Sequence, residues 1–221
     1  MGNEAKKTTA LWGNDVWALL KGQGLDIGAG SDPITADVRT FDKSDGDANR
    51  IDEYIYEKFD FVFSSHCLEH MLNPWDALSR WWKLVKPQGH LIVIVPDEDL
   101  YEQGWWPSLF NQDHKYTFTL NEQSWSPVSI NVNDLIRSLP NAEIVAVSRQ
   151  AHAYDLAVYE NRTKNRRFAL ALMWLSKKLT KLSRLASVSF NVRLPQWLGV
   201  PVDQTAHGAL AQIQFVIRKR I

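Results

Sequence analysis

The sequence predicts an α/β fold in which a doubly wound, mostly parallel sheet of seven strands is covered by helices on both faces. Short apolar runs, rich in β-branched and aromatic residues, alternate with helical stretches along most of the chain. Each run is apolar almost continuously rather than at every second position, which is typical of strands that are buried on both faces. A helical insertion is expected before the last strand.

The first half of the chain contains three predicted strands. Residues 11–20 are expected to form a short helix, and residues 24–27 a buried strand that runs into a glycine turn. Further strands are predicted over residues 38–41 and 59–64. A helix should follow from Pro74 to about residue 85, because proline is well tolerated in the first turn of a helix.

The second half continues the alternation and then departs from it. A turn leads into an apolar strand over residues 90–95, followed by a short helix over 133–138 and a strand over 142–147. Residues 151–207 break this rhythm, whereas residues 212–218 alternate like a strand with one polar face. We therefore expect one domain over residues 1–221, with an insertion at about 151–207 and a last strand after it.

Composition restricts the class of protein. The 221 residues include 25 basic and 25 acidic side chains, but residues 1–122 carry 20 acids and 11 bases, so the acidic charge lies in the first part of the chain. A single cysteine, Cys67, excludes an intrachain disulfide and a cysteine-based metal cluster, which favours a reducing, cytoplasmic setting. No metal site is expected. No signal peptide and no membrane-spanning run is expected either.

The glycine turn has the pattern of a ligand site. Glycines after a strand let the backbone turn sharply and let a ligand approach closely, as in the segment from Asp26 to Gly30. A dinucleotide site would need a third glycine, where Pro33 stands, and Asp32 adds negative charge. A diphosphate is therefore disfavoured, and a cationic or zwitterionic ligand is favoured.

This turn resembles the first motif of class I S-adenosylmethionine-dependent methyltransferases, the type 11-like group among them. The similarity continues through residues 39–42, 46–49, 59–70 and 84–96 in the expected order. The resemblance implies a Rossmann-like fold, S-adenosylmethionine as cofactor, an acid at Asp42 for the ribose hydroxyls, and an adenine contact near Asp47. The residues that it assigns to cofactor binding are Asp26, Gly28, Gly30, Asp42, Asp47, Ala48, Ser65 and His66.

Methyl transfer from a sulfonium to a hydroxyl or amine requires a base near the acceptor. Our catalytic candidates are His114, His66 and Asp97, with His114 first because a neighbouring acid can orient its imidazole. His66 has an alternative role as a helix cap or a cofactor contact. Trp105 and Trp106 in the loop over residues 97–116 would either stack on a sugar or aromatic acceptor or fold the loop onto the sheet.

The insertion carries the basic charge of the chain. Residues 161–193 contain nine Lys and Arg residues and no acid, and Phe168, Leu172 and Leu175 begin an apolar stripe at helical spacing. Residues 164–186 would form a basic amphipathic helix that contacts an anionic membrane at its inner face, an anionic acceptor, the acidic half of the chain or a second subunit. Nucleic-acid binding is disfavoured, because no groove-reading motif is present. The oligomeric state stays open.

Two functions follow from the sequence. The first is S-adenosylmethionine-dependent methyl transfer to a small-molecule, sugar or glycan acceptor. The shortened segment between Gly30 and Asp42 resembles methyltransferases found beside sugar and surface-glycan pathways. The alternative is a binding or scaffold protein that keeps the methyltransferase fold without catalysis, associated with a membrane through the basic helix.

Overall fold

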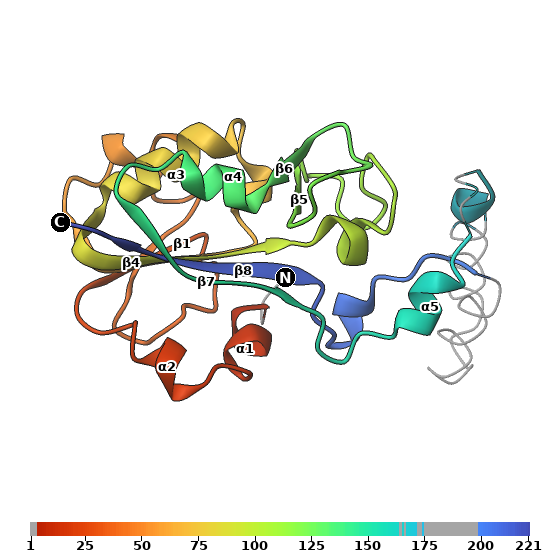
Figure 1. The fold of residues 1–221 in the computed structure, drawn as a ribbon, viewed down its shortest axis with the longest axis horizontal. Coiled ribbons are helices and arrows are strands. Elements are labelled where there is room, and N and C mark those ends of the chain that lie inside the picture. Colours follow the sequence, from red (N-terminus) through yellow and green to blue (C-terminus); the bar gives the residue numbers. More distant parts are fainter. Residues whose placement is uncertain (1–3, 164, 166, 172–173, 175–198) are drawn as a thin grey trace.

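A six-stranded sheet forms the centre of the computed structural model, which describes residues 4–163, 165, 167–171, 174 and 199–221 (Figure 1). The strand order is β2-β1-β3-β4-β8-β7. Neighbours are parallel from β2 to β4, and β8 is antiparallel to both β4 and β7. The strands are β1 (Gly24–Ile27), β2 (Arg39–Phe41), β3 (Phe59–Ser65), β4 (Val85–Pro96), β7 (Ala142–Gln150) and β8 (Gln212–Lys219).

The mostly parallel α/β architecture is confirmed, with one strand fewer in the main sheet than the seven predicted. Between β2 and β3, residues 42–58 form an acidic loop and the 3-10 helix η1 (Ala48–Glu53). The helix expected over residues 11–20 is also shorter. Gly13 is the N-cap of α2 (Asn14–Trp17), and a separate helix, α1 (Glu4–Thr9), precedes it.

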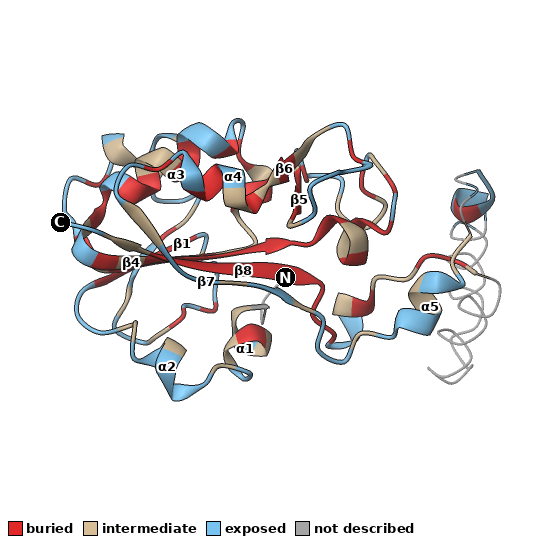
Figure 2. Cartoon of the chain, viewed as in Figure 1, coloured by how far each residue is buried: buried red, intermediate tan, exposed pale blue. Residues whose placement is uncertain are grey.

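Helices cover both faces of the sheet. In Figure 1, α3 (Pro74–Lys83) and α4 (Val132–Arg137) lie on one face and α1 and α2 on the other. Helix α3 begins where the sequence predicts, with Pro74 in its first turn and the Asn73 side chain accepting hydrogen bonds from the next backbone amides. β4 and β8 are buried over residues 91–96 and 212–217, as Figure 2 shows.

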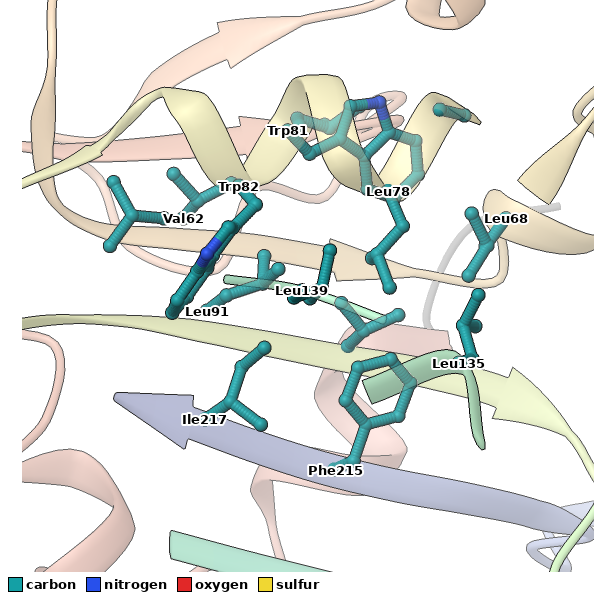
Figure 3. Close-up of a cluster of buried hydrophobic side chains, with 14 of the residues drawn as sticks. Val62, Leu68, Leu78, Trp81, Trp82, Leu91, Leu135, Leu139, Phe215 and Ile217 are labelled. Carbon is teal, nitrogen blue, oxygen red and sulfur yellow. The ribbon is translucent and has the colours of Figure 1, made fainter. Parts of the chain in front are cut away.

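The larger hydrophobic core lies between α3 and the sheet (Figure 3). Trp81 and Trp82 are fully buried, and each indole donates one hydrogen bond of 2.9 Å, to the carbonyl oxygens of Ala48 and Pro140 respectively. A buried indole N–H without a partner would be costly, so these bonds fix both rings. The first of them fastens the loop at Ala48 to the core.

Beyond the sheet, β5 (Thr117–Thr119) and β6 (Ser129–Asn131) form a separate parallel pair. The π-helix η3 (Glu98–Glu102) follows β4, and the 3-10 helix η2 (Leu68–His70) follows β3. Helix α5 (Leu156–Glu160) lies beyond the sheet, at the right of Figure 1. The 3-10 helix η4 (Gln204–His207) leads back toward β8.

Most of the predicted basic amphipathic helix, residues 164–186, lies outside the described residues. Residues 167–171 and 174 are helical, and Trp174 is exposed. Among the residues that are described, no helix is both long and apolar enough to cross a membrane.

Candidate active site

A cavity of about 780 Å³ opens at the carboxyl ends of β1, β2 and β3. In parallel α/β sheets this edge is where ligands bind, because loops rather than helices close it. Every residue that the sequence assigns to the cofactor lines this cavity: Asp26, Gly28, Gly30, Asp42, Asp47, Ala48, Ser65 and His66.

The β1 turn needs its glycines. Gly28 has φ +78°, and a Cβ added there would lie 2.9 Å from both Cβ and Sγ of Cys67. Gly30 has φ +56°. Left-handed backbone and a close neighbour together exclude larger side chains, so the turn presents bare backbone to the cavity.

Asp42 joins the end of β2 to the glycine turn. One carboxylate oxygen accepts a hydrogen bond of 2.8 Å from the Gly30 amide, and the other accepts one of 2.7 Å from the Lys43 amide. Each oxygen keeps a further lone pair, because a carboxylate can accept about four hydrogen bonds. The side chain is therefore held rigidly and can still accept from two hydroxyl groups.

Asp26 is a buried acid in the cavity wall. Its Oδ2 accepts a hydrogen bond of 2.8 Å from the Ile34 amide. Burial raises the pKa of Asp26 to about 7, although that hydrogen bond acts in the opposite direction. A cation placed beside this carboxyl would favour its charged form.

The loop after β2 is ordered by its own polar side chains. Asp47 caps η1 and accepts from both the backbone and the side-chain nitrogen of Asn49, which lowers the pKa of Asp47. The Asn49 side-chain oxygen accepts from the Leu72 amide at 2.7 Å. Together with the Trp81 bond to Ala48, these contacts hold the loop over residues 46–49 against the cavity.

His66 follows β3 in the left-handed region, with φ +52°. Such a conformation is uncommon for a side-chain-bearing residue and recurs at functional sites. Its Nε2 lies 3.1 Å from Oε1 of Gln212 on β8, and its Nδ1 lies 3.6 Å from Oε1 of Glu69. The preceding residue, Ser65, has a buried hydroxyl with no hydrogen-bond partner among the described residues.

Of the three catalytic candidates, His66 lines the cavity, whereas His114 and Asp97 do not. Asp97 is fully buried: one oxygen accepts from the Asp99 and Leu100 amides, and the other accepts from Arg149 Nε at 2.6 Å. Burial raises the pKa of Asp97, and Arg149 opposes this. These contacts give Asp97 the position of a structural carboxylate.

His114 is also buried, and its Nδ1 lies 2.7 Å from Oε1 of Glu102. The acid beside its imidazole is thus Glu102 on η3, not the adjacent Asp113. Asp113 and Lys115, the residues on either side of His114, line the cavity.

The sequence did not predict that His70 and helix α1 contribute to the cavity wall. His70 lines it, and the Nδ1 of His70 lies 3.1 Å from Oδ2 of Asp113. Ala5 on α1 lines it as well, and Lys6 on the same helix pairs with Asp32 at 2.7 Å. The N-terminal helix therefore closes one side of the cavity, which no local sequence pattern indicates.

The aromatic residues of the loop after β4 do not line the cavity. Trp105 is buried, and Phe110 packs its ring edge-on against Tyr101 with 5.9 Å between ring centres. The sequence left two roles open for Trp105, and its burial agrees with the second, in which the loop folds onto the body of the protein.

The sequence matches the family model for a methyltransferase domain over residues 13–126, more than half of the chain, so the chain belongs to that family. The expected class, that of the class I S-adenosylmethionine-dependent methyltransferases, is confirmed. No curated protein sequence matches the chain.

The chain is similar to solved structures. A Bacillus halodurans protein provisionally described as a methyltransferase has a TM-score of 0.51 and 12% identity, with 100% of both chains covered. A SAM-dependent methyltransferase from Thermotoga maritima has a TM-score of 0.48 and 16% identity, with 99% of this chain and 88% of that chain covered. At such identities the likeness concerns the fold.

Proposed function

We propose that this protein transfers a methyl group from S-adenosylmethionine to a small-molecule, sugar or glycan acceptor through a hydroxyl or amine. The observation that carries the proposal is the single cavity in which all eight assigned cofactor residues meet. The donor set suits this cofactor: a close-approach glycine turn, a rigid carboxylate at the end of β2 and a buried carboxyl in the wall. We assign residues 1–221 to one domain, with an insertion at about 151–207.

We assign a part of the cofactor to each segment of the cavity. Asp42 would accept from the ribose hydroxyls, and the loop at Asp47 and Ala48 would border the adenine. Asp26 would face the amino group of the methionine portion, where an ammonium stabilises a carboxylate that burial otherwise disfavours. The bound cofactor supplies an electrophilic methyl group, and the protein supplies alignment of donor and acceptor.

The acceptor would enter beside His66, His70 and Asp113, which line the cavity. This part of the wall is polar and titratable, as the acceptor side of a methyl transfer to oxygen or nitrogen requires. Among the three catalytic candidates, His66 keeps the role of base, since it is the one in the wall.

Calorimetric titration with S-adenosylmethionine and S-adenosylhomocysteine tests the proposal. We expect micromolar binding that the Asp42→Ala variant loses, because the ribose then has no carboxylate partner. Glu57→Ala is a matched control, because Glu57 is exposed, pairs with Arg39 and lies outside the cavity. Failure of the folded wild-type protein to bind either ligand would contradict the proposal and favour the alternative, a non-catalytic protein with this fold.

A further inference from the structure

A cluster of two imidazoles and a carboxylate lies at the cavity wall, where η2 meets the loop before β5. Glu69 and His70 come from η2, and His114 comes from the loop. One possible ligand atom from each of the three lies within 4.8 Å of those of the other two. The cofactor assignment uses none of these residues.

The outer nitrogen of each imidazole faces an acid. Nδ1 of His70 lies 3.1 Å from the backbone carbonyl oxygen of Asp113, its hydrogen-bond partner, and 3.1 Å from Oδ2 of the same residue; Nδ1 of His114 lies 2.7 Å from Oε1 of Glu102. A carbonyl oxygen, like a carboxylate, only accepts, so each Nδ1 must carry the proton that it donates. In the neutral imidazole the other nitrogen, Nε2, then has a free lone pair. Metal-binding histidines are oriented in this way by carboxylates behind them.

Both of these Nε2 atoms lie within 4 Å of the same carboxylate oxygen, as does Nδ1 of His66 at 3.6 Å. Oε1 of Glu69 lies 3.8 Å from Nε2 of His70 and 3.9 Å from Nε2 of His114. Glu69 is fully buried, and neither of its oxygens has a hydrogen-bond partner among the described residues. Lone pairs that face an anionic oxygen in a buried site repel it, and a cation among these atoms, either a proton on an imidazole or a metal ion, removes that repulsion.

We propose that Glu69, His70 and His114 bind one divalent transition-metal ion, with zinc as the preferred ion. Two imidazoles and one carboxylate are a ligand set that zinc takes in proteins, and they leave a coordination position open. Around a tetrahedral zinc, neighbouring ligand atoms lie about 3.4 Å apart. The two spacings to Oε1 of Glu69, 3.8 and 3.9 Å, need to close by about 0.5 Å, and all three ligand atoms already lie within 4.8 Å of one another. This assignment replaces the sequence-based expectation that no metal binds.

The ion would tie η2 to the loop that supplies Asp113 and Lys115 to the cavity wall. Two backbone-directed bonds already connect these segments, from the Lys115 amide to the Glu69 carbonyl and from Lys115 Nζ to the His70 carbonyl. The metal is therefore placed to hold the acceptor side of the cavity in shape. Its binding does not depend on the proposed function.

The test uses the full chain, without an affinity tag, after removal of metal by a chelator. We expect calorimetry with Zn²⁺ to show one ion per chain, and Co²⁺ to give visible absorption bands of low-symmetry coordination with nitrogen ligands. Glu69→Gln and His114→Gln should each weaken Zn²⁺ binding by at least about tenfold, since each removes one ligand. His152→Ala is the control and should bind as the wild type does, because His152 is exposed and lies outside the cluster.

Two results would overturn the proposal. One is a folded wild-type protein that binds no Zn²⁺; the other is binding of equal strength in both ligand variants. NMR of the wild-type histidine rings covers the case in which the variants do not fold. If Zn²⁺ leaves the ring signals of His70 and His114 unchanged, protons rather than a metal occupy the space beside Glu69, and the assignment is wrong.

Discussion

Asp26 is the residue whose charge depends most directly on what occupies the cavity. In the free protein burial raises its pKa to about 7, so the carboxyl is half protonated near neutral pH. An ammonium group beside it would stabilise the carboxylate, and binding of such a ligand would release a proton.

We therefore predict that S-adenosylhomocysteine binds more tightly as the pH rises toward 7. With a pKa of about 7, the ionised fraction of Asp26 grows by roughly tenfold between about pH 5.5 and 7, and affinity should rise by about that factor. Calorimetry across this range measures it. In Asp26→Asn, binding should be weaker at pH 7 and independent of pH below it; an unchanged pH dependence would show that another group is responsible.

Gly28 is the second residue whose substitution has a specific expected outcome. Gly28→Ala should lower the free energy of unfolding by about 1–3 kcal/mol and weaken cofactor binding, because φ is positive and the new Cβ would meet Cys67. Gly208→Ala is the matched control: φ is +94° there, but nothing lies within 4 Å of the added Cβ. Urea unfolding and calorimetry on both variants separate backbone strain from the clash, and equal effects on binding would contradict this explanation.

At the scale of elements, α3 holds the loop over residues 46–49 in place. Asn73 fixes the start of this helix, and the helix then buries Trp81 and Trp82 against the sheet (Figure 3). These two adjacent residues hold two different segments. The indole of Trp81 donates to Ala48 in the cavity wall, and that of Trp82 donates to Pro140 outside it.

This difference makes Trp81→Phe and Trp82→Phe a matched pair. Each removes one buried hydrogen bond and some packing area, so each should lower the free energy of unfolding by about 1–3 kcal/mol. Only Trp81→Phe should also weaken S-adenosylhomocysteine binding, by several-fold, because it frees the loop over residues 46–49, to which we assign the adenine contact. Equal affinities in the two variants, measured by calorimetry, would mean that the loop is held by its other contacts.

At the scale of the whole molecule, Arg149 connects the edge strand β7 to the loop after β4 through two ion pairs. Arg149 on β7 donates to the buried carboxylate of Asp97 at 2.6 Å and also pairs with Asp99 at 3.3 Å. The exposed fraction of the Asp97 side chain is 0%. Removing the cation would leave a buried charge without its partner, which costs more than the pair itself contributes.

Arg149→Met should therefore lower the free energy of unfolding by about 2–4 kcal/mol, and the double variant Asp97→Asn/Arg149→Met should recover a large part of that loss. Urea unfolding of the double-mutant cycle measures both. The double variant also tests the sequence-based hypothesis that Asp97 is catalytic. Once an acceptor is known, a stable double variant with wild-type turnover would rule that hypothesis out.

Much of the architecture was predictable because it depends on local patterns. Strands β1, β3 and β4 are apolar runs in which propensity, burial and turn residues agree, and α3 has both its proline and its cap within the same few residues. The alternating pattern of β8 located the strand, although its expected polar face is buried at Gln212 and Gln214. The seventh strand had no residue range of its own, since the local patterns marked six strands, and these six form the main sheet.

The sequence by itself determined the fold class, the glycine turn and the acids at its edge, since each follows from residues that are neighbours in the chain. Only the tertiary structure decided which histidines line the cavity. His66, His70 and His114 look alike in the sequence, yet two lie in the wall and the third turns inward to Glu102 and Glu69. The direction of a side chain in a loop is set by the segments packed around it, and these come from distant parts of the chain.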